Sequence, residues 1–213
     1  MTTTISLNKL GKKFNKEWIF RNLDYEIQAG QKLVILGGNG SGKSTLLQVI
    51  SGFVSPNEGF VNFTQSTSEK IEADKIKNHI SFASPYLQLV EDFTLTEMIE
   101  HAQIFKPYKP SVSAKEVTSL IELQTAENKF IKQFSSGMKQ RLKLGLAILA
   151  DTSVLLLDEP VSNLDKNAIV WYKELISNYT KDRTVIVCSN DISDEHFFCN
   201  TKLNVMDYKL PMK

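Results

Sequence analysis

The order of apolar and polar residues divides the chain into short strands and helices. Residues 23–27 alternate between apolar and polar side chains, which is typical of a half-buried strand. Residues 154–157 are continuously apolar and residues 184–188 are rich in β-branched side chains, so both are predicted to be buried strands. Helix-like stretches at 138–149 and 169–179 alternate with these strands. The pattern therefore predicts an α/β fold with a parallel sheet that helices cover on both faces.

Weaker strand candidates precede and interrupt this core. Residues 5–7 and 18–20, together with 23–27, predict a small antiparallel β layer at the N-terminal end of the chain. Residues 60–63 and 80–83 are two further short strand candidates, and a turn signal precedes the first of them.

Helix signals replace strands in the middle of the chain. Thr94-Leu95-Thr96-Glu97 has the form of a capping box, which predicts a helix from Thr94 that ends before Pro107. Ser113-Ala114-Lys115-Glu116 is a second capping box and opens another short helix. The expected organisation is a single domain, residues 1–213, with an α/β core at 1–84 and 134–213 and an inserted helical subdomain at 85–133.

Composition limits the class of protein. The chain has 213 residues and a formal charge of +1, so its length allows a large core and its charge gives no argument for a nucleic-acid partner. Cys188 and Cys199 lack the spacing of metal or disulfide motifs and indicate reduced thiols of a cytosolic protein. We see no signal peptide, and the apolar runs are far shorter than the ~20 residues that span a bilayer.

The stretch Gly37-Gly38-Asn39-Gly40-Ser41-Gly42-Lys43-Ser44-Thr45 fits the phosphate-binding pattern G-x-x-x-x-G-K-[ST]. A strand-like run precedes it and a helix-like run follows it, which is the context that the motif requires. Its glycines let backbone N–H groups approach phosphate oxygens, and the helix contributes the positive end of its dipole. Lys43 is expected to reach the β- and γ-phosphates and the Ser44 hydroxyl to bind Mg²⁺. The motif predicts a site for a nucleoside triphosphate.

Two carboxylates follow the buried strand at 154–157. Asp158 and Glu159 stand at its carboxyl end, the edge of an open α/β sheet where ligands bind. Asp158 is expected to hold Mg²⁺ directly or through a water. Glu159 is expected to orient or deprotonate the water that attacks the γ-phosphate. The alternative, an acidic turn that merely ends a strand, is disfavoured by the complete phosphate loop.

These motifs, in this order, resemble the ATP-binding subunits of ABC transporters. Gly37–Thr45 match Walker A, and Leu155–Pro160 match Walker B with its catalytic glutamate. Phe134-Ser135-Ser136-Gly137-Met138 match the family signature, usually L-S-G-G-Q, and Ser162–Asp165 match the D-loop. Phe14 falls where the family carries an aromatic residue that stacks on adenine. From the sequence alone, packing at a strand end is an equally good account of Phe14.

The resemblance implies an ATPase with a P-loop NTPase fold that uses ATP and Mg²⁺. It also implies a head-to-tail dimer with two ATP molecules at the interface, in which Ser135 and the Gly137 backbone of one subunit contact the γ-phosphate held by the other. The helical insertion would dock on transmembrane permease subunits, which places the protein in the cytoplasm on the inner face of the membrane. The signature Ser-Ser-Gly-Met-Lys-Gln-Arg narrows the resemblance to ABC-2-type and cytochrome c biogenesis (haem-export) transporters, so an exporter is expected.

The chain departs from the family pattern at three places. The signature has Ser136 and Met138 where glycine and glutamine are usual, which we expect to have a mild effect. The glutamine that contacts Mg²⁺ after the strand 80–83 is missing, and Gln88 is near but out of register. Asn190 stands in the place of the switch histidine. Asparagine can donate to phosphate but cannot become cationic, so slow turnover is expected.

Two other functions stay open. The first is a non-transport ABC ATPase that acts on ribosomes or DNA, although such proteins usually carry two cassettes or a long coiled coil that this chain lacks. The second is a binding-dominant subunit of an asymmetric pair, which Asn190 favours and Glu159 opposes. The second ATP-binding subunit is then a different chain, whereas the main hypothesis allows either a homodimer or a heterodimer.

Overall fold

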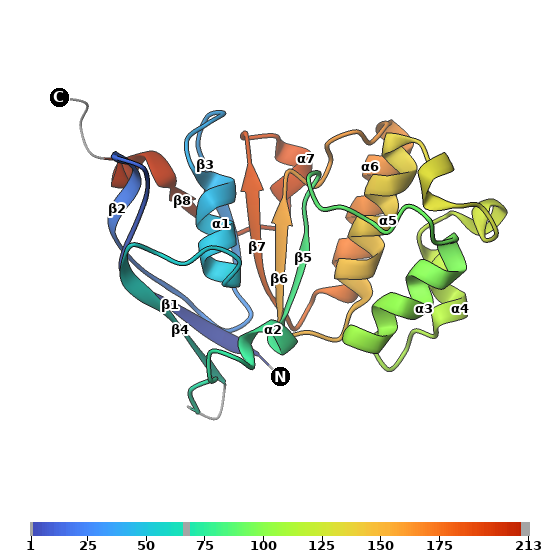
Figure 1. The fold of residues 1–213 in the computed structure, drawn as a ribbon, viewed down its shortest axis with the longest axis horizontal. Helices are drawn as coiled ribbons and strands as arrows, with labels where there is room; N and C mark the ends of the chain where they lie inside the picture. Colours follow the sequence, from blue (N-terminus) through green and yellow to red (C-terminus); the bar gives the residue numbers. More distant parts are fainter. Residues whose placement is uncertain (1, 66–68, 210–213) are drawn as a thin grey trace.

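The computed structural model describes residues 2–65 and 69–209, which form two β-sheets with helices around them (Figure 1). A three-stranded antiparallel sheet has the order β2-β1-β4, and a five-stranded parallel sheet has the order β5-β6-β7-β3-β8. The antiparallel strands are β1 (Thr3–Phe14), β2 (Glu17–Ile27) and β4 (Glu58–Gln65). The parallel strands are β3 (Lys32–Leu36), β5 (Ile80–Ala83), β6 (Val154–Asp158), β7 (Thr184–Ser189) and β8 (Thr201–Asn204).

The helices complete the element order. The α-helices are α1 (Lys43–Ser51), α2 (Ile76–His79), α3 (Leu95–Phe105), α4 (Ala114–Leu120), α5 (Ser136–Leu149), α6 (Lys166–Tyr179) and α7 (Ser193–His196). The 3₁₀ turns are η1 (Gln124–Ala126), η2 (Ile131–Gln133) and η3 (Val205–Tyr208). In Figure 1 the antiparallel sheet and the pair α3 and α4 lie at opposite ends of the molecule.

The parallel sheet separates two apolar cores, as its continuous apolar strands predict. Successive side chains of β6 point to opposite faces because a strand has a period of two. Leu155 and Leu157 join the core formed with α3 to α6, while Val154 and Leu156 join the core formed with α1 and the antiparallel sheet. All four side chains are fully buried. The prediction of a parallel sheet covered on both faces is therefore confirmed.

The antiparallel layer is more continuous than the sequence pattern indicates. The candidates 18–20 and 23–27 belong to one strand, β2. They look separate in the sequence because Asn22, between them, adopts a positive φ of 55° that interrupts the alternation. In β1, Lys9 has a φ of 44° beside a shift in register with β2, which ends the apparent alternation at Leu7. The predicted antiparallel layer at the N-terminal end is confirmed, and the structure adds a third strand to it, β4, which follows α1.

The chain between β5 and α5 carries the two predicted helices. The Glu97 carboxylate accepts a hydrogen bond from the Thr94 N–H at 2.8 Å, and the Glu116 carboxylate accepts one from the Ser113 N–H at 2.8 Å. Both capping boxes are therefore confirmed, and the apolar faces of α3 and α4 pack in the same core as α5. In the described parts of the chain, no helix is both long enough and apolar enough to cross a membrane.

The edge strand β8 has no counterpart in the sequence analysis. It spans four residues, of which only Leu203 is buried, so it presents neither an apolar run nor a clear alternation. Its pairing with β3 defines it, with Leu203 opposite Ile35.

The buried guanidinium of Arg183 ties together the edge of the parallel sheet where β7 begins. It donates to the Ile148 carbonyl at 2.7 Å, to the Ser81 hydroxyl at 2.6 Å and to the Thr152 hydroxyl at 2.5 Å. These acceptors lie at the end of α5, in β5 and just before β6. Burial lowers the pKa of Arg183 to about 9. One side chain thus supplies donors both to β5 and to the connection between α5 and β6, which are distant from each other in sequence.

We predict that Arg183→Ala lowers the free energy of unfolding by about 3 kcal/mol, because it leaves buried acceptors without a donor. Urea denaturation followed by circular dichroism measures this change. The matched control is Lys181→Ala, an exposed substitution two residues away that should stay within about 0.5 kcal/mol of the wild type. Equal midpoints for the two variants would contradict this role of Arg183.

Candidate functional site

The loop between β3 and α1 folds over the side chain of Lys43. This ammonium is buried and donates to the carbonyls of Gly37 at 2.8 Å and Gly38 at 3.0 Å, and to Asn190 Oδ1 at 2.8 Å. Its partners lie at the carboxyl ends of β3 and β7, which are neighbours in the sheet. The charge that the motif assigns to phosphate is therefore held inside the loop that would surround that phosphate.

Two glycines of this loop have no room for a side chain. A Cβ at Gly37 would collide with Ser41 Oγ, and a Cβ at Gly42 would collide with Ile19 Cγ2. Gly42 also has a φ of 104°, in the region that favours glycine. The glycines at these positions are thus required for the tight turn that leads into α1.

Ser41 provides a test of whether the loop fits a ligand. Its hydroxyl oxygen is buried within the loop and has no hydrogen-bond partner among the described residues. Buried polar atoms are seldom left without a partner, and an anion at the N-terminus of α1 would supply one. The loop therefore fits a phosphate group.

The buried carboxylate of Asp158 faces two hydroxyl groups. Ser44 Oγ donates to Asp158 Oδ1 at 3.0 Å, and Ser84 Oγ donates to Oδ2 at 3.3 Å. Burial raises the pKa of Asp158 above its usual value, although the hydrogen bond from Ser44 opposes the shift. Ser44 and Asp158 thus lie together, as the sequence predicts, and their oxygens are the ligand type that Mg²⁺ prefers.

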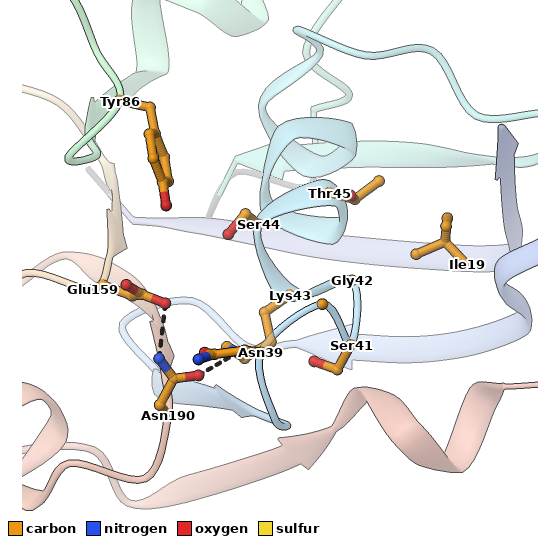
Figure 2. Close-up of a pocket in the computed structure, with 11 residues that line it drawn as sticks. Ile19, Asn39, Ser41, Gly42, Lys43, Ser44, Thr45, Tyr86, Glu159 and Asn190 are labelled. Carbon is orange, nitrogen blue, oxygen red and sulfur yellow. Dashed lines mark hydrogen bonds between the residues drawn. The ribbon is translucent and has the colours of Figure 1, made fainter.

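Glu159 is linked to Lys43 through Asn190. Asn190 Nδ2 donates to Glu159 Oε1 at 2.9 Å, while Asn190 Oδ1 accepts from Lys43, and Figure 2 shows both contacts. Glu159 adopts a φ of 44°, which is uncommon for a residue with a side chain. The amide of Asn190 thus uses one atom for the cation and the other for the carboxylate.

A cleft of about 520 Å³ is lined by Lys43, Ser44, Glu159 and Asn190, among others (Figure 2). The predicted residues along it are Asn39, Gly40, Ser41, Gly42, Lys43, Ser44, Thr45, Glu159 and Asn190. Gly37 and Gly38 contribute through their carbonyls, which hold Lys43. Two further lining residues, Ile19 and Tyr86, are not among the site residues predicted from the sequence.

Two residues singled out from the sequence lie elsewhere. Phe14 is the last residue of β1, and the Lys12 ammonium lies 5.0 Å from the centre of its half-exposed ring. Phe14 does not line the cleft, so its contact with adenine stays a prediction. Gln88 lines a different cavity, beside Lys139 and Lys143, and does not reach the cleft either.

The signature residues form a second site, separate from this cleft. Ser135 caps α5, and its Oγ accepts from the Met138 N–H at 3.2 Å. Ser135 and Gly137 line a cavity of about 470 Å³ together with Asn163 and Asp165 of the D-loop. A Cβ at Gly137 would lie 3.2 Å from the Asn163 carbonyl oxygen, so the signature and the D-loop are in close contact. The chain therefore presents its phosphate loop and its signature in two different cavities.

Comparison with known proteins is consistent with this arrangement. Residues 20–162 match the family described as "ABC transporter". The chain is 29% identical over 197 residues to "ABC transporter ATP-binding protein YtrE" of Bacillus subtilis, covering 88% of this chain and 85% of that protein. It is 30% identical over 204 residues to human "ATP-binding cassette sub-family A member 10", covering 93% of this chain but only 13% of that protein.

Solved structures agree on the fold. The structure titled "Dimeric structure of a post-hydrolysis state of the ATP-binding cassette MJ0796 bound to ADP and Pi" superposes with a TM-score of 0.80 at 24% identity, covering 98% of this chain and 97% of that chain. A "Putative ABC transporter (ATP-binding protein) from Pyrococcus furiosus" superposes with a TM-score of 0.77 at 21% identity, covering 97% of this chain and all of that one. The match to the family spans most of the chain and includes the phosphate loop, the signature and the Asp158-Glu159 pair, so the chain belongs to the ABC transporter family, as an ATP-binding and ATP-hydrolysing domain.

Proposed function

We propose that this chain energises a membrane transporter by hydrolysing Mg²⁺-ATP between two nucleotide-binding subunits. The observation that carries the proposal is the convergence of Lys43, Asn190 and Glu159 on one cleft while the signature faces another. A site split in this way is completed by the cleft of one subunit and the signature cavity of a second, which is either a copy of this chain or a related one.

Different residues of the site are assigned to phosphate binding, to Mg²⁺ binding and to activation of the attacking water. Lys43 and the backbone N–H groups at the start of α1 bind phosphate, and Ser44 and Asp158 hold Mg²⁺, which neutralises phosphate charge. Glu159 orients the attacking water and accepts its proton. Ser135 and the N-terminus of α5, presented by the second subunit, bind the γ-phosphate from the opposite side.

The helical subdomain at 85–133 supplies the docking surface for a transmembrane subunit. A groove of about 440 Å³ between α3, β5 and α5 is lined mainly by apolar side chains, among them Phe82, Leu89 and Phe105. Phe105 is 69% exposed, which is a large apolar area for a side chain to leave in water. We propose a short amphipathic helix of a permease as its occupant, which places the protein on the cytoplasmic face of the membrane.

The relatives do not narrow the direction of transport. Their names include a "Sulfate/thiosulfate import ATP-binding protein CysA" and a "Lipoprotein-releasing system ATP-binding protein LolD". Export, and the ABC-2-type or haem-export subtype, therefore stay proposals that rest on the signature sequence.

Lys43→Ala tests the phosphate site. Removing a charged donor should weaken ATP binding by about 10- to 100-fold and reduce turnover with it. Equilibrium titration with a fluorescent ATP analogue measures the affinity, and urea denaturation checks that the loop remains folded. Lys202→Ala, on the exposed face of β8, is the matched control. Unchanged affinity in Lys43→Ala would mean that the loop is not the nucleotide site.

Glu159→Gln tests the assigned base and the split site together. The amide keeps the shape of the carboxylate but accepts no proton, so ATP should bind, turnover should cease and a dimer should accumulate. Size-exclusion chromatography with and without Mg²⁺-ATP detects the dimer. Hydrolysis at the wild-type rate would remove Glu159 from the mechanism, and a variant that stays monomeric with bound ATP would contradict the two-subunit site.

Asn190→His separates a full ATPase from a binding-dominant subunit. A histidine can carry charge next to the developing negative charge, whereas the amide is a neutral donor. We expect kcat to rise about tenfold, since one preorganised contact to developing charge can be worth about 10² in rate. A fall in kcat would instead show that the amide bridge between Lys43 and Glu159 is the working arrangement, with asparagine adapted to its place.

A further inference from the structure

The loop that follows β5 lies between the nucleotide cleft and the apolar groove. Its residues 84–89 contribute to both, because Tyr86 lines the cleft whereas Leu87 and Leu89 line the groove. A cavity of about 500 Å³, lined by this loop together with Glu91, Lys139 and Lys143, lies alongside. The loop therefore has one face toward the nucleotide and another toward the proposed docking surface.

This loop is anchored on both sides of Tyr86. Ser84, before it, donates to Asp158 at 3.3 Å and accepts from the Tyr86 N–H at 3.4 Å. The Pro85 carbonyl accepts from Lys143 Nζ of α5 at 2.5 Å, and the Leu87 N–H donates to the Ser84 carbonyl at 3.1 Å. These bonds define the path of the backbone and therefore the point from which the Tyr86 side chain extends.

The Tyr86 ring extends into the cleft on the side where phosphate chemistry is expected. It is 81% exposed, and Figure 2 shows its hydroxyl group directed toward the space between Ser44 and Glu159. Ile19 lies at the other side of the same cleft in that view. In the proposed function, Ser44 binds Mg²⁺ and Glu159 faces the γ-phosphate. A group between these two residues would therefore contact the terminal phosphate and not the adenine ring.

We propose that the Tyr86 hydroxyl donates a hydrogen bond to the terminal phosphate of bound ATP. The proposal rests on the proposed function, since it assigns a further binding residue to the same site. A phenol is a neutral donor, and a hydrogen bond to a charged acceptor is stronger than one between neutral groups. Gln88, the nearest glutamine in the sequence, lines the neighbouring cavity and does not face the cleft.

The anchor at Lys143 gives this contact a route to α5, the signature helix. Lys143 is buried, its ammonium binds the carbonyl of the residue just before Tyr86, and its stem also lines the apolar groove. Burial lowers the pKa of Lys143, and the nearby charge of Lys139 lowers it further. Lys143 is thus a positioning residue that acts through Tyr86 and does not itself touch the nucleotide.

Tyr86→Phe is the direct test, because it removes one oxygen and keeps the ring. Competition against a fluorescent ADP gives the affinities of ADP and of an ATP analogue with a non-hydrolysable β–γ bond, both with Mg²⁺. The expected result is about tenfold weaker binding of the ATP analogue with ADP affinity unchanged, since only the analogue carries the terminal phosphate that the hydroxyl would bind. Tyr179→Phe, at the end of α6 and outside the cleft, is the matched control and should leave both affinities unchanged.

Other results of these binding measurements would overturn the proposal. Equal losses for ATP analogue and ADP, or none for either, would overturn the contact with the terminal phosphate. A loss in Tyr86→Ala that Tyr86→Phe does not show would assign the effect to the ring and overturn the role of the hydroxyl. A wild-type chain that binds neither nucleotide would refute the proposed function itself, which is a distinct result.

Lys143→Met tests the route to α5 with the same measurement. It should lower the preference for the ATP analogue over ADP, and the loss in the double variant with Tyr86→Phe should be less than the sum of the two single losses. Fully additive losses would show that Lys143 does not act through Tyr86.

Discussion

The order of three neighbouring parallel strands, β6-β7-β3, is the constraint on which the site depends. Their carboxyl ends meet at one edge, so Glu159 after β6, Asn190 after β7 and Lys43 after β3 come together although they are far apart in the chain. The central position of β7 explains why Asn190 bridges the other two. A side chain that follows the middle strand can reach both neighbours, and an amide offers a donor and an acceptor at once.

Burial of the sheet on both faces fixes the positions of the strand ends at this edge. Alternate residues of β6 and β7 enter two separate cores, and most of them are fully buried. A well-packed core resists small displacements, so the loops at its edge start from defined positions. The same burial also affects the charges near the site. It raises the pKa of Asp158 above its usual value, and it raises the pKa of Glu195 to about 7. Carboxyl groups in such surroundings gain most from a nearby cation.

The separation of the phosphate loop from the signature supports the proposal that a second subunit completes the site. Ser135 caps α5 and faces the D-loop, whereas Lys43 lies in another cavity. In the proposed dimer, ATP bound to both surfaces would favour the closed state and hydrolysis would remove that preference, which is a two-state element biased by a ligand. The loop 84–89 lies beside the cleft and beside the apolar groove, so it is well placed to respond to the same change.

The sequence by itself determined the elements whose signal is local. Lys43, Ser44 and Asp158 could be assigned because the phosphate loop and the acidic pair are contiguous motifs, and the helices after Thr94 and Ser113 because a capping box needs only four residues. Only the tertiary structure showed β8, which exists through its pairing with β3, and the continuity of β1 and β2 across Lys9 and Asn22. It alone brought Ile19 and Tyr86 into the cleft. The physical reason is that a motif depends on residues that are neighbours in the chain, whereas the lining of a cleft depends on where distant segments pack.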